Sequence, residues 1–487
     1  MATKSFRVVN SCRVDIPAPL KERLFEHLFP GDGDEHAAVL AAAIARDGDD
    51  VRLLVRHVML ALDGVDYVAG VRGYRHLRGE FVHRCLTYCR ENGLAYLAVH
   101  NHGGNYQVEF SDVDLASHER GYPALLDLMQ GLPVGAVVFA KKAAAGDIWW
   151  STSLRTPTTE VRVIGHQIER LTASPMQPLF CSDEKYGRQV LLFGELGQTL
   201  LKGATVGVIG AGGAGSLIVE HLARLGVGRI IVADPDQIET TNLSRVVGAT
   251  RWDARWPFTS ANAPQWLRKV AKRFAATKVS IAHRVAKTAN AKVDFVGIPK
   301  SIVEAEAAGQ FLHCDFLFLA ADSASARLVF NSIVQQYYVP GIQVGAKVRT
   351  CEETGELHDV FSVMRWTLPG HGCLWCSGLI SPHRLALEAK TEEERQEQRY
   401  GTESPNPSVI TLNAVAASNA VNEFLFAILG LRRKVDASIW GYMWHHMDQR
   451  MTVDAAKPEP SCGECSARSH SRFGRGDDHV LPTQHSR

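Results

Sequence analysis

The feature that most constrains the fold of this chain is a glycine-rich segment, KGATVGVIGAGGAGS, between an apolar run and an amphipathic run. Its residues Gly210, Gly212 and Gly215 fit the spacing G-x-G-x-x-G. Small residues at these places let backbone N–H groups and a helix N-terminus approach a phosphate. Asp234 ends the next apolar run, at the distance expected of a carboxylate that holds ribose hydroxyls. The segment therefore predicts a Rossmann-type nucleotide site, which an NAD-binding domain would also contain.

The chain has 487 residues, too many for one compact core, so its length predicts two domains. Strand and helix patterns alternate from residue 202 onward, which is typical of a doubly wound parallel sheet. Upstream, the strand patterns VRLLVRHVML, LAYLAVH and GAVVFAKK mix with the helix patterns PLKERLFEHLF, HAAVLAAAIA and EFVHRCLTYCREN, which predicts an α/β domain. We expect domains at 1–170 and 183–466, a linker rich in Ser, Thr and Pro at 171–182, and a disordered tail at 467–487.

The overall charge of the chain is nearly balanced, with 53 Lys and Arg against 52 Asp and Glu and a formal net charge of +1. No global field would recruit nucleic acid or an anionic membrane, so neither is expected as a partner. The N-terminus lacks a signal-peptide pattern, and apolar stretches such as FLFAILGL are too short to span a bilayer. Ten cysteines in a chain this long do not form a disulfide scaffold. We therefore expect a cytoplasmic protein.

Four further motifs accompany the glycine loop in a fixed order: YGRQ at 186–189, TNLSR at 241–245, TKV at 277–279 and ADS at 321–323. The series resembles the ThiF/MoeB/ubiquitin-activating family over about residues 183 to 466. The resemblance implies a Rossmann-like doubly wound sheet, ATP and Mg²⁺ as cofactors, and a homodimer. It implies that Gly210, Gly212, Gly213, Gly215, Asp234 and Asn242 bind the nucleotide, Arg245 and Lys278 face the phosphates, Asp322 holds Mg²⁺, and Arg188 reaches across from a second subunit.

The chemistry of adenylation explains why these residue types are needed. A carboxylate that attacks the α-phosphate brings two anions together, so the site must neutralise the transition state and the departing pyrophosphate. Hydride transfer makes no pyrophosphate, which leaves no task for Lys278 or Asp322 and argues against an NAD-dependent oxidoreductase.

An apparent insertion, RWDARWPFTSANAPQWLRKVAKRF, separates Arg245 from Lys278. Its basic, Trp-bearing end predicts a short amphipathic helix. The expected role of this helix is surface packing.

Two Cys-x-x-Cys pairs, Cys373 with Cys376 and Cys462 with Cys465, offer four thiolates at a spacing that suits one tetrahedral zinc ion. The alternatives are a redox pair or chance neighbours, but the resemblance places a structural zinc at these pairs. Four sulfur ligands leave no open position, so we expect this metal to be structural.

Many members of the same family carry a crossover-loop cysteine that takes the acyl group as a thioester, but residues 377–461 contain no cysteine. The chain is thus expected to stop at the acyl-adenylate or to pass it to an external nucleophile. Cys181, Cys314 and Cys351 remain formal candidates, whereas Cys85 and Cys89, one helical turn apart, are expected in a core.

A second metal pattern lies in the N-terminal domain, where His100 and His102 end an apolar strand and Asp114 follows a Gly-rich loop. Two imidazoles and a carboxylate would fill three of the four coordination positions of a zinc ion and leave one open for water, which is the layout of a hydrolytic zinc site. The alternative is two histidines that make ordinary hydrogen bonds at a strand end.

The order His100, His102, Ser111, Asp114 resembles the JAMM/MPN metalloproteases. The resemblance implies a JAMM/MPN-like α/β domain in which His100, His102 and Asp114 hold zinc and Ser111 helps to hold the oxyanion. It implies Glu35 as the general base. Glu80 and Glu91 are the fallback candidates for that role.

Together these patterns predict a fusion of a JAMM-type isopeptidase with a ubiquitin-activating-like adenylyltransferase, acting on the C-terminal glycine of a ubiquitin-like protein. Trimming a precursor and adenylating the bared carboxylate are consecutive steps on one chain end. Activation of a sulfur-carrier protein for cofactor synthesis is an alternative. A nucleotide-binding scaffold with an inactive recognition module is another, which metal content and ATP–pyrophosphate exchange would test.

Overall fold

The structure is a computed structural model that describes residues 8–68, 75–180, 182–260, 262–351, 354, 356–389, 407–455, 457–468 and 470–484. The chain divides into two compact units. Unit 1 comprises Met1–Gln177, Gln335–Tyr338 and Cys465–Val480, and unit 2 comprises Pro178–Val334, Val339–Glu464 and Leu481–Arg487. The first division therefore falls inside the expected linker.

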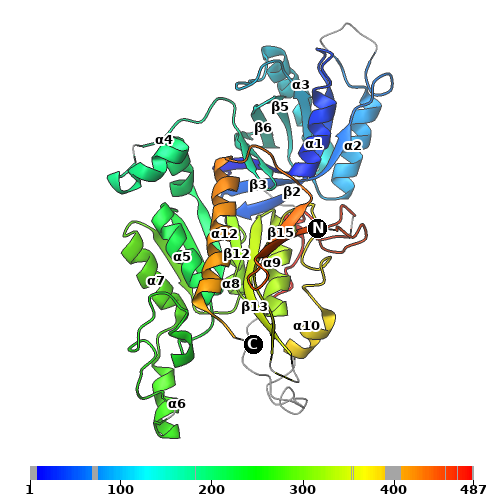
Figure 1. Cartoon of the computed structure of the whole chain (residues 1–487). Helices are drawn as coiled ribbons and strands as arrows, with labels where there is room; N and C mark the ends of the chain where they lie inside the picture. The colour runs from blue at the N-terminus through cyan, green and yellow to red at the C-terminus, as the bar shows by residue number, and fades with distance from the viewer. Residues whose placement is uncertain are drawn as a thin grey trace. The chain divides into compact units, whose positions relative to one another are not determined.

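Unit 1 is built on one eight-stranded sheet in the order β1-β3-β2-β4-β5-β6-β7-β8. β1 (Ser11–Pro17) pairs in parallel with both β3 and β7, so seven strands close into a barrel. The other strands are β2 (Ala37–Asp47), β3 (Asp50–Leu60), β4 (Ala95–Asn101), β5 (Val134–Ala140), β6 (Ala143–Ser151), β7 (Leu154–Ile164) and β8 (Ile168–Leu171). Figure 1 shows α1 (Ala18–Leu28), α2 (Gly79–Glu91) and α3 (Asp112–Met129) around them.

One predicted helix of unit 1 is wrong, because HAAVLAAAIA forms strand β2. This strand pairs antiparallel with β3 on one side and β4 on the other. Ala38 and Leu40 enter one core cluster, while Val39 and Ala41 enter a second. A run buried on both faces shows neither helical nor strand periodicity, so only pairing decides between them. The predicted helices over PLKERLFEHLF and EFVHRCLTYCREN are confirmed by α1 and α2.

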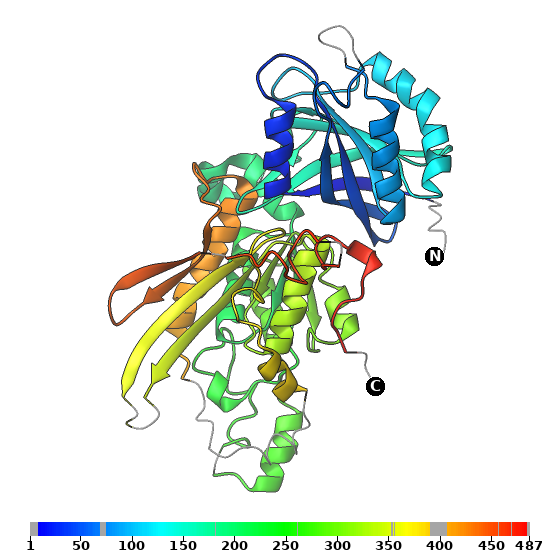
Figure 2. The same cartoon turned by 90° about the vertical axis from the view of Figure 1, so that its right-hand side faces the viewer.

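Unit 2 contains the second eight-stranded sheet, in the order β11-β10-β9-β12-β13-β14-β15-β16. The strands from β11 to β13 are parallel, as predicted, but β13 to β16 are antiparallel. The strands are β9 (Thr205–Ile209), β10 (Arg229–Ala233), β11 (Asp294–Ile298), β12 (Phe316–Leu319), β13 (Gly341–Thr350), β14 (Leu357–Thr367), β15 (Ile439–His445) and β16 (Arg450–Ala455). β13 continues to Thr350, beyond its last pairing with β12 at Gln343, and Figure 2 shows this antiparallel part running past the parallel strands.

The helices of unit 2 are α4 (Gly187–Gly203), α5 (Gly213–Leu225), α6 (Gln265–Arg273), α7 (Lys278–Ala289), α8 (Ala305–Gly309), α9 (Ala324–Tyr337), α10 (Pro382–Glu388) and α12 (Ile410–Leu429). By length and composition α12 alone among the described helices could cross a membrane, with a mean hydropathy of 1.3. It packs against α5, β13 and β14, and a helix buried in a protein core passes the same test.

Among the described residues of the predicted disordered tail, 467–468 and 470–484, the segment 470–484 departs from the prediction. Within unit 1, Phe473 is 3% exposed and its carbonyl accepts a 2.8 Å hydrogen bond from Arg56 Nε. The Asp477 carboxylate accepts a 2.9 Å hydrogen bond from the backbone N–H of Arg46. A segment poor in apolar residues is thus held by one buried ring and by specific polar contacts, which composition does not reveal.

Candidate nucleotide and metal sites

The glycine-rich loop joins β9 to α5 at the carboxyl ends of the parallel strands. Gly210 has a φ of 95°, in the left-handed region that favours glycine. A Cβ on Gly215 would lie 1.9 Å from the Gly210 carbonyl oxygen, so helix and loop approach too closely for any side chain. Gly212 is the N-cap of α5, and because it has no side chain it makes no capping hydrogen bond to the helix. The first N–H groups of the helix are therefore available to a phosphate.

Asp234 follows β10 beside this loop and is buried. Its Oδ2 accepts a 2.7 Å hydrogen bond from the backbone of Ala211, and its Oδ1 accepts one of 2.9 Å from that of Asp236. Burial raises the pKa of Asp234 above its usual value. Lys278 opens α7, with its Nζ 2.6 Å from Asp236 Oδ2 and 3.8 Å from Asp234 Oδ1. The structure thus brings Asp234 and Lys278 together.

Asn242 and Arg245 lie on and just after the short helix η2 (Thr240–Asn242). The side-chain oxygen of Asn242 accepts a 3.1 Å hydrogen bond from the backbone of Glu239. One guanidinium nitrogen of Arg245 donates a 3.0 Å hydrogen bond to the Thr241 carbonyl. A Cβ built on Gly213 would lie 3.4 Å from Arg245 Cδ, so this arginine borders the start of α5.

Asp322 follows β12 at the same edge of the sheet and is exposed. A Cβ built on Gly210 would lie 3.0 Å from the backbone of Ala320, two residues before this carboxylate. Arg188 is exposed in the first turn of α4. Among the described residues of the single chain, no hydrogen bond or ion pair connects Arg188 with the other predicted site residues.

Glu388, at the end of α10, is a neighbour of this edge that the sequence did not indicate. Its carboxylate accepts hydrogen bonds of 2.7 Å and 2.9 Å from the backbone N–H groups of Ala324 and Ser325, which open α9 two residues after Asp322. Partial burial opposes ionisation, but these hydrogen bonds hold the pKa of Glu388 below its usual range. No local pattern marks such a contact, since 63 residues separate Ser325 from Glu388.

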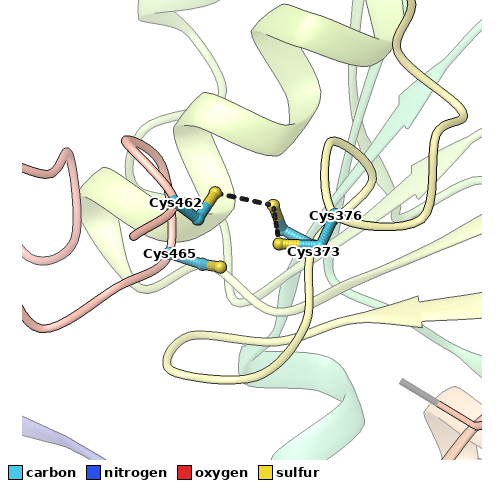
Figure 3. Close-up of side chains that lie close together, drawn as sticks. All are labelled: Cys373, Cys376, Cys462 and Cys465. Carbon is cyan, nitrogen blue, oxygen red and sulfur yellow. Dashed lines mark hydrogen bonds between the residues drawn. The ribbon is translucent and has the colours of Figure 1, made fainter. Parts of the chain in front are cut away.

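The four paired cysteines converge as predicted, with their sulfur atoms within 4.8 Å of one another (Figure 3). The Sγ atoms of Cys373 and Cys376 are 3.7 Å apart, and those of Cys373 and Cys462 are 3.8 Å apart. Zn–S bonds of about 2.3 Å in a tetrahedron place sulfurs about 3.8 Å apart, whereas a disulfide needs about 2.05 Å. Cys465 completes the set. The donor set fits zinc and leaves no open position.

Among the described residues, none of the other cysteines is exposed as a nucleophile would be. Cys314 is buried and Cys351 is half-buried. Cys85 and Cys89 are buried, as expected, and burial raises the pKa of Cys85 to about 12. The candidate Cys181 lies outside the described residues.

The predicted ligands of unit 1 also converge. The Nε2 atoms of His100 and His102 are 3.1 Å apart, and they lie 3.5 Å and 3.4 Å from Asp114 Oδ2. Two Zn–N bonds of about 2.0–2.1 Å in a tetrahedron separate the nitrogens by about 3.3 Å, so the three side chains fit one zinc ion. Hydrogen bonding to Asp114 raises the pKa of His102. Partial burial opposes ionisation of Asp114, but hydrogen bonds from both histidines and Ser111 hold its pKa well below the usual range.

Glu35 is brought to this cluster by strand pairing. Ala37 of β2 pairs with His100 of β4, and the backbone N–H of His36 donates a 2.6 Å hydrogen bond to the side-chain oxygen of Asn101. As a result Glu35 Oε1 lies 3.9 Å from His102 Nε2.

Three other predicted residues of unit 1 have different surroundings. The Ser111 hydroxyl donates a 2.7 Å hydrogen bond to Asp114 and caps α3, so in this structure it orients the Asp114 carboxylate. Glu80 and Glu91, the fallback bases, are exposed on α2, outside the metal-binding group.

Comparison with known proteins identifies the family of unit 2. The ThiF family model matches residues 186–464, which excludes the barrel strands of unit 1. The *Bacillus subtilis* sulfur carrier protein ThiS adenylyltransferase is 28% identical over 219 residues, 42% of this chain and 57% of the relative. The *B. subtilis* tRNA threonylcarbamoyladenosine dehydratase is 45% identical over 65 residues, 13% of this chain and 26% of the relative.

Among solved structures, *E. coli* MccB with ATP is 21% identical, with a TM-score of 0.42 over 58% of this chain and 75% of that one. The chain spans less than two thirds of the length of the curated relatives named above. The family match covers more than half of the chain and includes the glycine loop, Asp234, Lys278 and three of the four clustered cysteines. The chain therefore belongs to the ThiF family.

Proposed function

We propose that unit 2 uses ATP to adenylate the C-terminal carboxylate of a ubiquitin-like or sulfur-carrier protein. The observation that carries the proposal is the convergence of three features at the carboxyl ends of β9 and β10. These are the uncapped start of α5, the buried Asp234, and Lys278, whose Nζ is 3.8 Å from that carboxylate. Together these features suit a nucleotide, with its ribose hydroxyls at Asp234 and its negatively charged phosphates at the start of α5 and Lys278.

The same residues suit the chemistry of the step. A carboxylate oxygen of the substrate attacks the α-phosphorus, a P–O bond to the β-phosphate breaks, and pyrophosphate leaves. Arg245 and Lys278 would neutralise the negative charge that gathers in this transition state. The N–H groups of α5 would hold the phosphates. Asp322 would hold Mg²⁺, which screens the triphosphate when it is bound.

The ThiS adenylyltransferase relative supports a small carrier protein as the substrate, and ubiquitin-like proteins offer the same chemistry at their C-termini. We place the reaction in the reducing cytoplasm, because the four-cysteine site needs free thiolates. In a homodimer, the exposed Arg188 would serve the site of the partner subunit.

The test is carboxylate-dependent ATP–pyrophosphate exchange with candidate carrier proteins. We expect exchange that depends on the carrier's C-terminal carboxylate and is lost when that end is amidated. If the chain binds ATP and a carrier protein but catalyses no exchange with any carrier that it binds, the result would support the scaffold alternative.

For unit 1 we propose zinc-dependent hydrolysis of the bond that follows the C-terminal glycine of the same modifier. The supporting observation is that three side chains spaced for zinc lie beside Glu35, whose carboxylate is 3.9 Å from His102. A bound zinc would act as a Lewis acid, with a fourth position free for substrate or water. Glu35 would accept the proton of the attacking water and deliver it to the leaving amine.

Cleavage of a C-terminally extended modifier, measured together with zinc content, tests this second activity. Hydrolysis at the glycine is the expected result. A protein that holds only the zinc of the four-cysteine site and leaves its own modifier uncut would make unit 1 a recognition module.

A further inference from the structure

The insertion between Arg245 and Lys278 forms a lobe of unit 2, described at residues 250–260 and 262–275, which we call the α6 lobe. A small core anchors it, since Ala254 and Ala275 pack with Ile238 and neighbouring apolar side chains. Lys272 also forms a 3.1 Å ion pair with Glu239. Figures 1 and 2 both draw α6 at the lower edge of unit 2, away from the strands of the sheet.

The outer side of α6 is apolar although it faces solvent. Trp266 and Val270 of α6 and its C-cap residue Phe274 follow one another at four-residue spacing and therefore lie along one side of the helix. They are 68%, 47% and 66% exposed, so the described part of the chain leaves about half or more of each residue open to solvent. Three more exposed aromatic side chains occur in the same lobe: Trp252, Trp256 and Phe258.

The α6 lobe is strongly basic in a chain that is nearly neutral. It contains six basic residues and one acidic residue, a net +5, which leaves the rest of the chain at −4. The single acidic residue, Asp253, is paired with Arg284. Lys269 and Arg273 are exposed, and the helical period places them beside the apolar side of α6.

We propose that the α6 lobe docks on an anionic lipid surface, with α6 in the plane of the interface. A helix with a Trp- and Phe-bearing apolar side and a Lys- and Arg-rich polar side is the form that such peripheral anchors take. The positive charge complements anionic headgroups, and Lys269 and Arg273 can reach them while Trp266 and Phe274 enter the acyl boundary.

The alternative occupants fit these observations less well. A symmetric contact between two copies would bring two lobes of charge +5 together, which repel. Single-stranded nucleic acid would use the aromatic faces for stacking, but Val270, in the middle of the apolar side, has no such face.

Co-sedimentation of the full chain with lipid vesicles tests the proposal. We expect binding to vesicles enriched in phosphatidylserine, weaker binding to pure phosphatidylcholine, and release at high salt. Trp266→Ser with Phe274→Ser, and separately Lys269→Glu with Arg273→Glu, should each weaken binding roughly tenfold or more. Met451→Ser and Lys434→Glu, at exposed positions outside the lobe, are the matched apolar and charge controls.

Each other outcome overturns the proposal. These outcomes are no binding of the parent chain to anionic vesicles, an equal loss of vesicle binding in the control variants, or vesicle binding that is unchanged in both lobe variants. Binding of a labelled single-stranded oligonucleotide through the lobe, without vesicle binding, would assign the lobe to nucleic acid. Concentration-dependent self-association that the lobe variants abolish would assign it to a second copy. The proposed membrane contact does not involve the nucleotide site. No outcome of the vesicle experiment therefore changes the result that we expect in the ATP–pyrophosphate exchange assay.

Discussion

Replacing Gly215 by alanine probes the nucleotide loop directly. The new Cβ would lie 1.9 Å from the Gly210 carbonyl oxygen, whereas real Cβ atoms keep at least 3.0 Å, so loop and helix must separate by about 1.1 Å. The obstacle is backbone and cannot rotate away. Overpacking of this kind destabilises by about 1–3 kcal/mol. The shift would also break at least one charge-assisted hydrogen bond to a phosphate, worth about 1.5–3 kcal/mol, or roughly tenfold to a hundredfold in ATP affinity.

Isothermal titration calorimetry with Mg·ATP and thermal unfolding measure the two effects of Gly215→Ala separately. Gly203→Ala, with no atom within 4 Å of its new Cβ, is the control for a glycine change as such. Gly212→Ala also meets no protein atom within 4 Å, so weaker ATP binding at unchanged stability would place a phosphate beside it. A Gly215→Ala protein that binds ATP within twofold of the parent would refute this placement of the nucleotide.

Four further predictions concern the remaining sites. Asp322→Ala should abolish ATP–pyrophosphate exchange at an unchanged melting temperature, because the carboxylate is exposed and does not pack; near-parental exchange would contradict its role. Arg188→Ala should lower exchange similarly, and mixed dimers of the two variants should regain part of it if the arginine acts across subunits. Cys373→Ser should lower zinc content and stability together, since a structural metal is coupled to folding; a stable, active variant without that zinc would count against this. Glu35→Ala should keep zinc in unit 1 but lose modifier cleavage, whereas His102→Ala should lose both; cleavage by the Glu35 variant would exclude it as the base.

The parts of the site that are local in sequence were predictable from the sequence. The glycine loop, Asp234 and the two Cys-x-x-Cys pairs depend on short spacings that a turn or a metal ion imposes, and each lies as predicted. The helices α1 and α2 were predictable for the same reason, because an amphipathic period is visible within one segment.

The features that the sequence missed, and the approach of Glu35 that only the JAMM/MPN resemblance implied, depend on contacts between distant segments. The run HAAVLAAAIA became β2 because β3 and β4 flank it, and the same pairing moves Glu35 to within 3.9 Å of His102. Glu388 reaches the start of α9 across 63 residues. The antiparallel strands β14 to β16 extend the parallel sheet by pairing that no local pattern marks.

The sequence by itself determined the chemistry that this chain can hold: which residues offer phosphate-binding N–H groups, thiolates, imidazoles and cations, and in what order. Only the tertiary structure decided which of them meet. It closed unit 1 into a barrel by pairing β1 with β7, and it left Trp266 and Val270 of α6 and its C-cap Phe274 largely exposed to solvent. The physical reason is that spacing constrains a residue's near neighbours, whereas burial and pairing are settled by the packing of the whole unit.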